Sequence, residues 1–289
     1  MDNTARIEQN LEAVIARATS SGCPPKLSAA IHHAVFPGGA RVRPSLTLAV
    51  ADACQNRDDR VADGAAAAIE LLHCASLVHD DLPCFDDADI RRGNPSVHAA
   101  YGEPIAVLAG DALIVEAFNA LAQGCTNTPE RLAPLSMCIT KCAGMTGGIT
   151  AGQAWESEEA IDLEQYHSAK TGALFVGAVT AGALAAGQDP AQWRPLGRYI
   201  GAAYQIADDL LDAVGTAAEC GKPVAQDVNN NRPSAVDEYG LSGAVAKLKE
   251  TVQAAADCVP ECGRADELRT LIVGQAKRLV PETLARQTV

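Results

Sequence analysis

Five acidic residues followed by two arginines occur in one short segment, His79-Asp80-Asp81-Leu82-Pro83-Cys84-Phe85-Asp86-Asp87-Ala88-Asp89-Ile90-Arg91-Arg92-Gly93. Residues 65–78, which precede it, are almost entirely apolar, so we expect a buried helix that ends at the carboxylates of Asp80 and Asp81. A carboxylate removed from water is costly unless it is paired or binds a metal ion. Because no lysine or arginine lies within one helical turn of this pair, the sequence favours a bound cation at the helix end.

A second acidic cluster closes another apolar run further along the chain, in Tyr204-Gln205-Ile206-Ala207-Asp208-Asp209-Leu210-Leu211-Asp212. The spacing of four residues places Asp208 and Asp212 on one face of a helix. A single aspartate pair is more often a solvated helix terminus. Two copies in nearly uncharged helices instead favour one shared acidic site.

The composition indicates a globular helical protein with a core of small and aliphatic side chains. Of the 289 residues, 48% are hydrophobic, 20% charged and only 4% aromatic. No linker or low-complexity run divides the chain, so we expect a single domain over residues 1–289. The net charge of −13 argues against a nucleic-acid-binding surface, which would be basic.

Cysteine usage and the N-terminus indicate the cytoplasm. None of the ten cysteines forms a C-x-x-C pair, and the first residues carry no apolar signal segment, so reduced thiols are expected. The longest uncharged run, residues 171–187, is rich in Gly and Ala and is slightly short for a membrane span. We interpret it as a buried helix and expect no transmembrane segment.

Helical periodicity and Pro/Gly punctuation predict helices throughout. The expected helices cover residues 7–18, 26–36, 60–81, 103–123, 128–145, 171–187, 241–256 and 265–280, with another beginning near Pro44. No hairpin signal or alternating pattern is found, so the predicted fold class is all-α.

Several basic residues lie where they could bind an anion. The segment Gly38-Gly39-Ala40-Arg41-Val42-Arg43-Pro44 combines glycines, two arginines and a helix start, which makes either an anion seat or an ordinary helix connection. His73 lies seven residues before Asp80 and hence on the same helix face. Lys170-Thr171-Gly172 opens the small-residue helix, and Lys222 and Arg232 lie in the polar loop after the second acidic cluster.

The two acidic clusters favour Mg²⁺, because all-oxygen sites suit hard cations better than Zn²⁺. The run Asp86-Asp87-Ala88-Asp89 lacks the turn glycine and final glutamate of an EF-hand, and no Walker loop, Rossmann pattern, G-x-S-x-G or H-E-x-x-H motif occurs. The remaining chemistry is metal-assisted handling of a diphosphate in an apolar helical cavity.

These residues resemble the trans-isoprenyl diphosphate synthases over nearly the whole chain. The matching motifs, in order, are Asp80-Asp81-x4-Asp86 with Arg91-Arg92-Gly93, Lys170-Thr171-Gly172, and Gln205-x-x-Asp208-Asp209-x-x-Asp212. The segments 38–44, 80–86 and 151–158 look closest to the geranylgeranyl diphosphate synthases of bacterial carotenoid and bacteriochlorophyll pathways.

The resemblance implies an all-helical, single-domain bundle around a deep central cavity, a homodimer, and condensation of isopentenyl diphosphate with dimethylallyl, geranyl or farnesyl diphosphate. It implies three Mg²⁺ ions held by Asp80, Asp86 and Asp208, supported by Asp81, Asp209 and Asp212. It assigns the allylic diphosphate to Arg91, Lys170, Gln205 and Lys222, and isopentenyl diphosphate to Gly39, Arg43, His73 and Arg92. Thr171 would lie beside the nascent carbocation.

Two positions depart from the family pattern. Ala40 replaces a lysine that many relatives carry, which removes one expected contact with isopentenyl diphosphate, and Arg232 stands roughly where relatives have a late lysine. A farnesyl diphosphate synthase is the nearest alternative. A class I terpene cyclase would lack the second aspartate motif, and an inactive regulatory subunit would have lost one motif, whereas both are intact here.

Product length is expected to depend on the turn before Asp80. Ala75 and Ser76 lie five and four residues upstream, roughly 6–8 Å along the helix axis. Farnesyl-making relatives usually carry an aromatic ring at one of these positions, whereas both side chains are small here. We therefore expect a twenty-carbon product that stops against a deeper wall such as Leu71, Leu72 or Phe118; alternatively, Ala75 only packs against a neighbouring helix.

Overall fold

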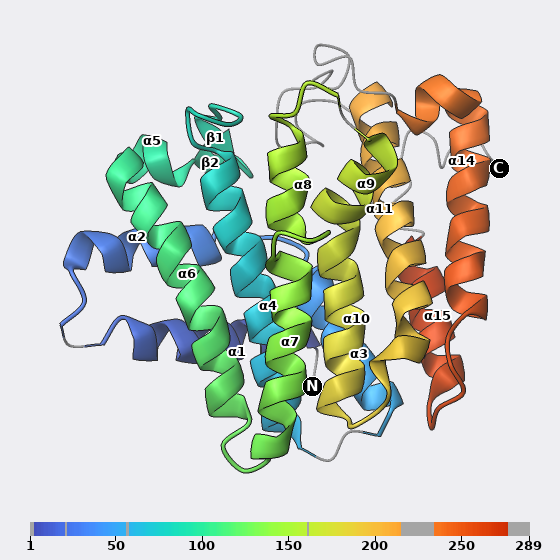
Figure 1. Cartoon of the computed structure of the whole chain (residues 1–289), viewed down its shortest axis with the longest axis horizontal. Helices are drawn as coiled ribbons and strands as arrows, with labels where there is room; N and C mark the ends of the chain where they lie inside the picture. Colours follow the sequence, from blue (N-terminus) through green and yellow to red (C-terminus); the bar gives the residue numbers. More distant parts are fainter. Residues whose placement is uncertain (1–2, 21, 56–57, 161, 215–233, 277–289) are drawn as a thin grey trace.

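The computed structural model describes residues 3–20, 22–55, 58–160, 162–214 and 234–276, and its architecture is helical (Figure 1). The main helices are α1 (Asn3–Ala18), α2 (Pro25–Val35), α3 (Val42–Ala53), α4 (Asp59–Asp80), α5 (Val97–Tyr101), α6 (Glu103–Gly124), α7 (Leu132–Ala143), α8 (Ile149–Trp155), α9 (Leu163–His167), α10 (Ala173–Ala185), α11 (Arg194–Val214), α14 (Ala235–Asp257) and α15 (Ala265–Ala276). The described residues also form two short 3₁₀ turns, η1 (Pro129–Arg131) and η3 (Pro190–Trp193), and a π-helical turn, η2 (Ser168–Gly172). The predicted all-α fold class is confirmed.

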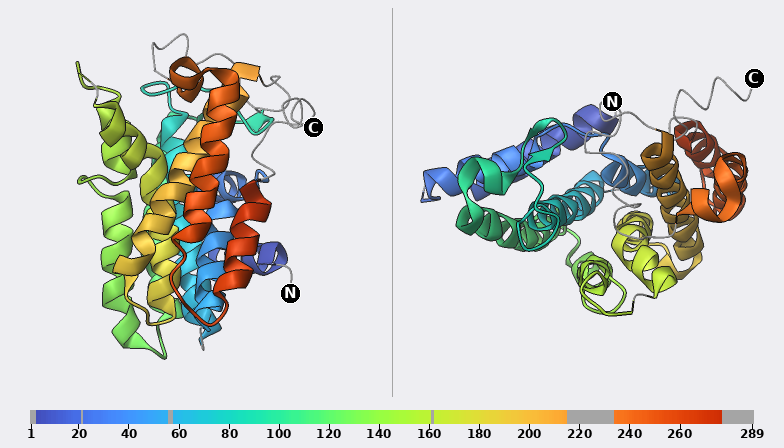
Figure 2. Two further views of the ribbon diagram at one scale, coloured as in Figure 1. Left: turned by 90° about the vertical axis from the view of Figure 1, so that its right-hand side faces the viewer. Right: turned by 90° about the horizontal axis from the view of Figure 1, so that it is seen from above.

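Helices α4 and α10 form the centre of the bundle, and most of their residues are buried. Helices α1, α2, α5 and α6 lie on one side of this centre, and α14 and α15 lie on the other (Figures 1 and 2). Small residues allow close packing: a Cβ on Gly64 of α4 would lie 2.8 Å from the carbonyl oxygen of Ala120 in α6. The alanine- and glycine-rich composition therefore sets how near the helices approach.

Several helix ends follow from local capping. The side chain of Asp58 accepts the backbone N–H of Arg60 at the start of α4, and α4 ends at Asp80 as predicted. Ser234 and Asp237 form a capping box at the start of α14. The backbone of Gly240 within α14 is non-helical, with φ 66° and ψ 168°, so a short first segment precedes a kink and the predicted helix begins after it at Leu241. The predicted helix over 128–145 is instead a 3₁₀ turn followed by α7, which ends before Gly144.

A small hairpin corrects the expectation that the chain contains none. Strand β1 (Ile90–Arg91) pairs antiparallel with β2 (Asn94–Pro95). The turn between them has positive φ at both central residues, 52° at Arg92 and 77° at Gly93. This backbone usually takes Asn-Gly or Asp-Gly, so an arginine at the first position concealed the signal. The hairpin turns Arg91 back toward the end of α4 and Arg92 toward the segment at Gly38.

Within the part of the chain that the structure describes, three helical segments are long and apolar enough to cross a membrane by length and composition alone. In Asp59–Asp80 and Leu163–Ala185, 83% and 67% of the apolar window is buried inside the protein. The uncharged run predicted as a buried helix is therefore largely interior. The third segment, α6, has only 39% of its window buried and exposes an apolar face.

Candidate active site

The first acidic motif is partnered by residues from elsewhere in the chain. The Nε of Arg91 donates to both carboxylate oxygens of Asp81, at 2.9 and 3.2 Å, and its Nη2 also donates to Oδ1. Asp81 is only 2% exposed, and burial raises its pKa while Arg91 acts in the opposite direction. The cationic partner of Asp81 in the structure is thus Arg91, which the hairpin brings from ten residues away and which lies beyond the single helical turn considered in the sequence.

Asp80 faces three polar groups at the end of α4. Its Oδ1 lies 3.6 Å from Nζ of Lys170 and accepts a hydrogen bond of 3.4 Å from Nε2 of Gln153. Its Oδ2 lies 3.9 Å from Nη2 of Arg91. Asp80, Arg91 and Lys170 therefore lie close together in the structure, as predicted. Gln153 is a further neighbour of Asp80 that the sequence did not predict.

Lys170 and Thr171 lie on the π-helical turn η2, which directs both side chains inward. Such wide turns often occur at functional sites. Nζ of Lys170 donates to Oε1 of Glu156 at 2.7 Å, and the hydroxyl of Tyr166 donates to the same oxygen at 2.7 Å. Sequence reasoning assigned no role to Glu156. The available signal was the spacing Gly152-Gln153-x-x-Glu156 on a short helix.

The second acidic motif is joined to the first through this turn. Oγ1 of Thr171 donates to Oε1 of Gln205 at 2.8 Å, and Nε2 of Gln205 donates to Oδ1 of Asp209 at 2.9 Å. Asp209 also accepts the backbone N–H of Ala235 at 2.7 Å, which is the first residue of α14. Asp209 therefore ties α11 to a helix N-terminus, where a carboxylate is favourable.

Asp208 is exposed and Asp212 is partly buried on the same continuous helix, in agreement with the predicted spacing. Both acidic helix ends lie at the upper end of the bundle in Figure 1. Among the residues that the structure describes, no three His, Cys, Asp or Glu side chains converge on one point. The carboxylates thus belong to one region without forming a closed cage.

Arg43 and His73 form a partly buried basic pair beneath this region. Nη1 of Arg43 lies 3.3 Å from Nε2 of His73, and its guanidinium stacks 4.5 Å from the centre of the Phe175 ring. Because arginine only donates hydrogen bonds, Nε2 of His73 is the acceptor and its proton is on Nδ1. Burial and the neighbouring Arg43 and Arg92 place the pKa of His73 well below 6.5.

Two polar atoms of this basic pair are orphaned. Nε of Arg43 and Nδ1 of His73 are buried and have no hydrogen-bond partner among the described residues. Burial also lowers the pKa of Arg43. Buried donors without acceptors are unfavourable, so these two atoms carry an uncompensated cost in the structure.

Arg92 reaches the glycine segment from the hairpin. Its Nη1 donates to the carbonyl oxygen of Gly38 at 2.7 Å, and a Cβ on Gly39 would lie 2.6 Å from the same nitrogen. Gly39 therefore leaves room for Arg92. Arg41 is instead buried against Glu8 and Glu70, with 2.7 Å ion pairs to each, so the predicted two-arginine anion seat contains only Arg43.

The predicted chain-length residues are buried in α4. Ala75 is 2% exposed, and the hydroxyl of Ser76 donates to the carbonyl oxygen of His73 at 2.8 Å. Phe118 is 37% exposed on the outer face of α6, so within one chain it does not form an inner wall. Lys222 and Arg232 lie outside the described residues.

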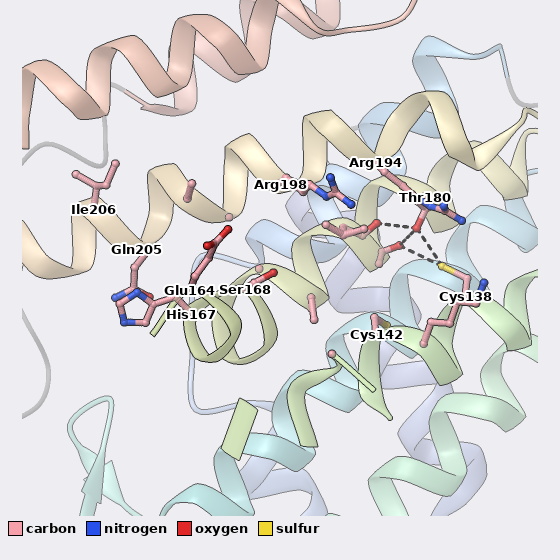
Figure 3. Close-up of a pocket in the computed structure, with 18 of the residues that line it drawn as sticks. Cys138, Cys142, Glu164, His167, Ser168, Thr180, Arg194, Arg198, Gln205 and Ile206 are labelled. Carbon is pink, nitrogen blue, oxygen red and sulfur yellow. Dashed lines mark hydrogen bonds between the residues drawn. The ribbon is translucent and has the colours of Figure 1, made fainter. Parts of the chain in front are cut away.

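A cavity of about 950 Å³ lies elsewhere, between α7, α9, α10, α11 and α14 (Figure 3). Cys138, Thr180, Arg194 and Arg198 are among its lining residues. Gln205 and Asp209 of the second acidic motif also line it, but none of the described residues of α4 does. The cavity therefore adjoins the second acidic motif and is not lined by Asp80.

The chain belongs to the polyprenyl synthetase family, whose sequence model matches residues 24–265. It is 50% identical over 280 residues to a geranylgeranyl diphosphate synthase of Cereibacter sphaeroides, covering 97% of each chain. It is 39% identical over 246 residues to a farnesyl diphosphate synthase of Geobacillus stearothermophilus, covering 80% of this chain and 81% of that protein. The family that the motifs predicted is thereby confirmed.

A solved relative has the same fold. The geranyltransferase of Helicobacter pylori, determined with magnesium and isoprenyl diphosphate, superimposes with a TM-score of 0.78 at 27% identity. The match covers 96% of this chain and 98% of that one. The similarity extends over the bundle rather than over one motif.

Proposed function

We propose that this chain is a Mg²⁺-dependent geranylgeranyl diphosphate synthase that joins isopentenyl diphosphate to dimethylallyl, geranyl or farnesyl diphosphate. The observation that carries the proposal is that the two acidic helix ends belong to one connected region. Asp80 contacts Lys170, and the neighbouring Thr171 donates a hydrogen bond to Gln205 of the second motif. Below them, Arg43 and His73 each have a buried nitrogen without a hydrogen-bond partner. The relative with 50% identity supports the twenty-carbon product. A farnesyl diphosphate synthase is the second candidate, because one relative at 39% identity has that activity.

The acidic residues fit Mg²⁺. Asp80, Asp86 and Asp208 would hold the ions, three in number by the family resemblance. Mg²⁺ takes much of its coordination from water and phosphate oxygens, so carboxylates on separate segments suit it without a closed cage. When bound, Mg²⁺ supplies positive charge to the departing diphosphate.

The chain's own groups would bind and orient the allylic diphosphate. Arg91 and Lys170 place two cations beside Asp80, at 3.9 and 3.6 Å, where negative charge grows on the leaving group. The hydrogen bond from Thr171 to Gln205 would hold both polar side chains in place beside the reacting allylic carbon. Buried helices on both sides exclude water from the carbocation.

Arg43, His73 and Arg92 would bind isopentenyl diphosphate, with Gly39 leaving space for Arg92. The isopentenyl double bond attacks the allylic carbon as the carbon–oxygen bond breaks. The new carbocation then loses a proton to the released diphosphate and becomes an alkene. No dedicated protein base is required.

Replacing Ala75 by tyrosine should shift the product from twenty toward fifteen carbons at similar total turnover. A ring on the turn before Asp80 would close the path of the growing chain, which runs alongside α4 in this proposal. Chain lengths of extracted products from isopentenyl and dimethylallyl diphosphates provide the measurement. Ala75→Ser, which keeps a small side chain, is the control. An unchanged twenty-carbon product in Ala75→Tyr would contradict the proposal that residue 75 lies at the end of the path of the growing chain.

We also propose a homodimer that uses the exposed face of α6. Five large apolar side chains are exposed at helical spacing along this face, namely Val107, Leu108, Ile114, Val115 and Phe118. A helix face of this kind usually contacts a partner, and an identical helix matches its length and chemistry.

The proposed location of the protein is the cytoplasm.

The substitution Val115→Asp should convert the protein to a monomer, because Val115 is 65% exposed at the centre of this face. Sedimentation velocity measures the change in mass. Met137→Asp is the matched control, since Met137 is 61% exposed on α7 away from the α6 face. A dimer that persists in Val115→Asp and is lost in Met137→Asp would assign the interface elsewhere.

A further inference from the structure

Helix α8 lies directly behind the lysine of the proposed diphosphate site. A Cβ on Gly152 would lie 2.3 Å from the backbone nitrogen of Lys170, so only glycine allows this approach. One residue further, Gln153 donates to Oδ1 of Asp80 and to the carbonyl oxygen of Ser76. A single short helix thus contacts both the π-helical turn and the first acidic motif.

The carboxylate of Glu156, at the end of α8, competes with Asp80 for one ammonium group. Nζ of Lys170 is 2.7 Å from Oε1 of Glu156 and 3.6 Å from Oδ1 of Asp80. Both carboxylates are largely shielded from water, with side-chain exposures of 14% and 12%. Tyr166 donates to the same oxygen of Glu156 and so fixes where that carboxylate lies.

We propose that Glu156 is a positioning residue that holds Lys170 at 3.6 Å from Asp80, so that their ion pair stays loose and the Asp80 carboxylate can also bind a divalent cation. The inference rests on the proposed function, because it takes Asp80 as a metal-binding residue. A lysine side chain has a flexible stem and a compact charge. Without Glu156 the ammonium group can shorten its existing 3.6 Å ion pair with Asp80, and a close, hydrogen-bonded pair there would compete with the metal.

Glu156→Gln should therefore weaken Mg²⁺ binding as well as activity. Calorimetric titration of Mg²⁺ into protein with inorganic diphosphate should show an affinity lowered about tenfold, the cost of displacing one ion pair. Glu156→Asp keeps the charge but shortens the reach, so we expect a smaller loss of about threefold. Glu158→Gln, an exposed acid two residues away, is the matched control and should bind Mg²⁺ like the wild type.

A double-mutant cycle with Lys170→Met isolates the proposed route. When Lys170 is absent, Glu156→Gln should change Mg²⁺ affinity less than about twofold, because no ammonium remains to reach Asp80. Multiplicative effects of the two substitutions, or wild-type Mg²⁺ affinity in both Glu156 variants, would overturn this inference alone. Unimpaired prenyl transfer by Lys170→Met would instead contradict the proposed function. Thermal unfolding of each variant checks that the fold is retained.

Discussion

Replacing Asp80 or Asp208 by asparagine is expected to lower kcat by about a thousandfold, a loss of roughly 4 kcal/mol of transition-state stabilisation. Each substitution keeps the side-chain volume but removes a charged oxygen ligand from a proposed Mg²⁺ site. The leaving diphosphate then loses part of the positive charge that stabilises it. The rate of product formation at saturating substrates and saturating Mg²⁺ is the measurement. Chelation of divalent cations should abolish turnover of the wild type.

The control for these variants is Asp257→Asn at the end of α14. Asp257 accepts a hydrogen bond from Gln253, and asparagine keeps the accepting oxygen. This variant should retain the wild-type rate. Near-wild-type turnover of Asp80→Asn or Asp208→Asn, with helical content unchanged by circular dichroism, would show that the metal assignment is wrong.

The second large effect is expected from Arg43→Met, which should raise KM for isopentenyl diphosphate about a hundredfold while changing kcat much less. Arg43 has an orphaned Nε that an anion can engage, and charge-assisted hydrogen bonds contribute about 1.5–3 kcal/mol each. When a substitution weakens binding of the ground state and of the transition state by the same amount, KM rises and kcat stays unchanged. KM for the allylic diphosphate should stay close to wild type.

Arg194→Met, which changes an exposed arginine on α11, is the control, and an unchanged KM in Arg43→Met would refute the assignment of this pocket.

Local sequence signals predicted the helical framework well. The apolar run before Asp80, the caps and the Pro and Gly breaks act over a few residues, so α4, α6 and α10 were predicted close to their observed bounds. The order and spacing of the acidic motifs also identified the family. Motif spacing carried this information because each motif lies at one helix end.

The partners of the acidic residues could not be predicted in this way. Arg91 reaches Asp81 across a hairpin whose turn lacks the usual Asn-Gly, and Asp209 meets the N-terminus of α14 far along the chain. Glu156 contacts Lys170 only because α8 packs on the π-helical turn. These contacts depend on tertiary packing, which leaves no local pattern in the sequence.

Product analysis tests the central claim most directly. The purified protein is incubated with Mg²⁺, isopentenyl diphosphate and, separately, dimethylallyl, geranyl or farnesyl diphosphate, and the chain length of the released alcohols is measured after dephosphorylation. We predict geranylgeraniol, with twenty carbons, as the main product from each primer that is accepted, and none without Mg²⁺. Products that stop at fifteen carbons, with farnesyl diphosphate not extended, would contradict the account.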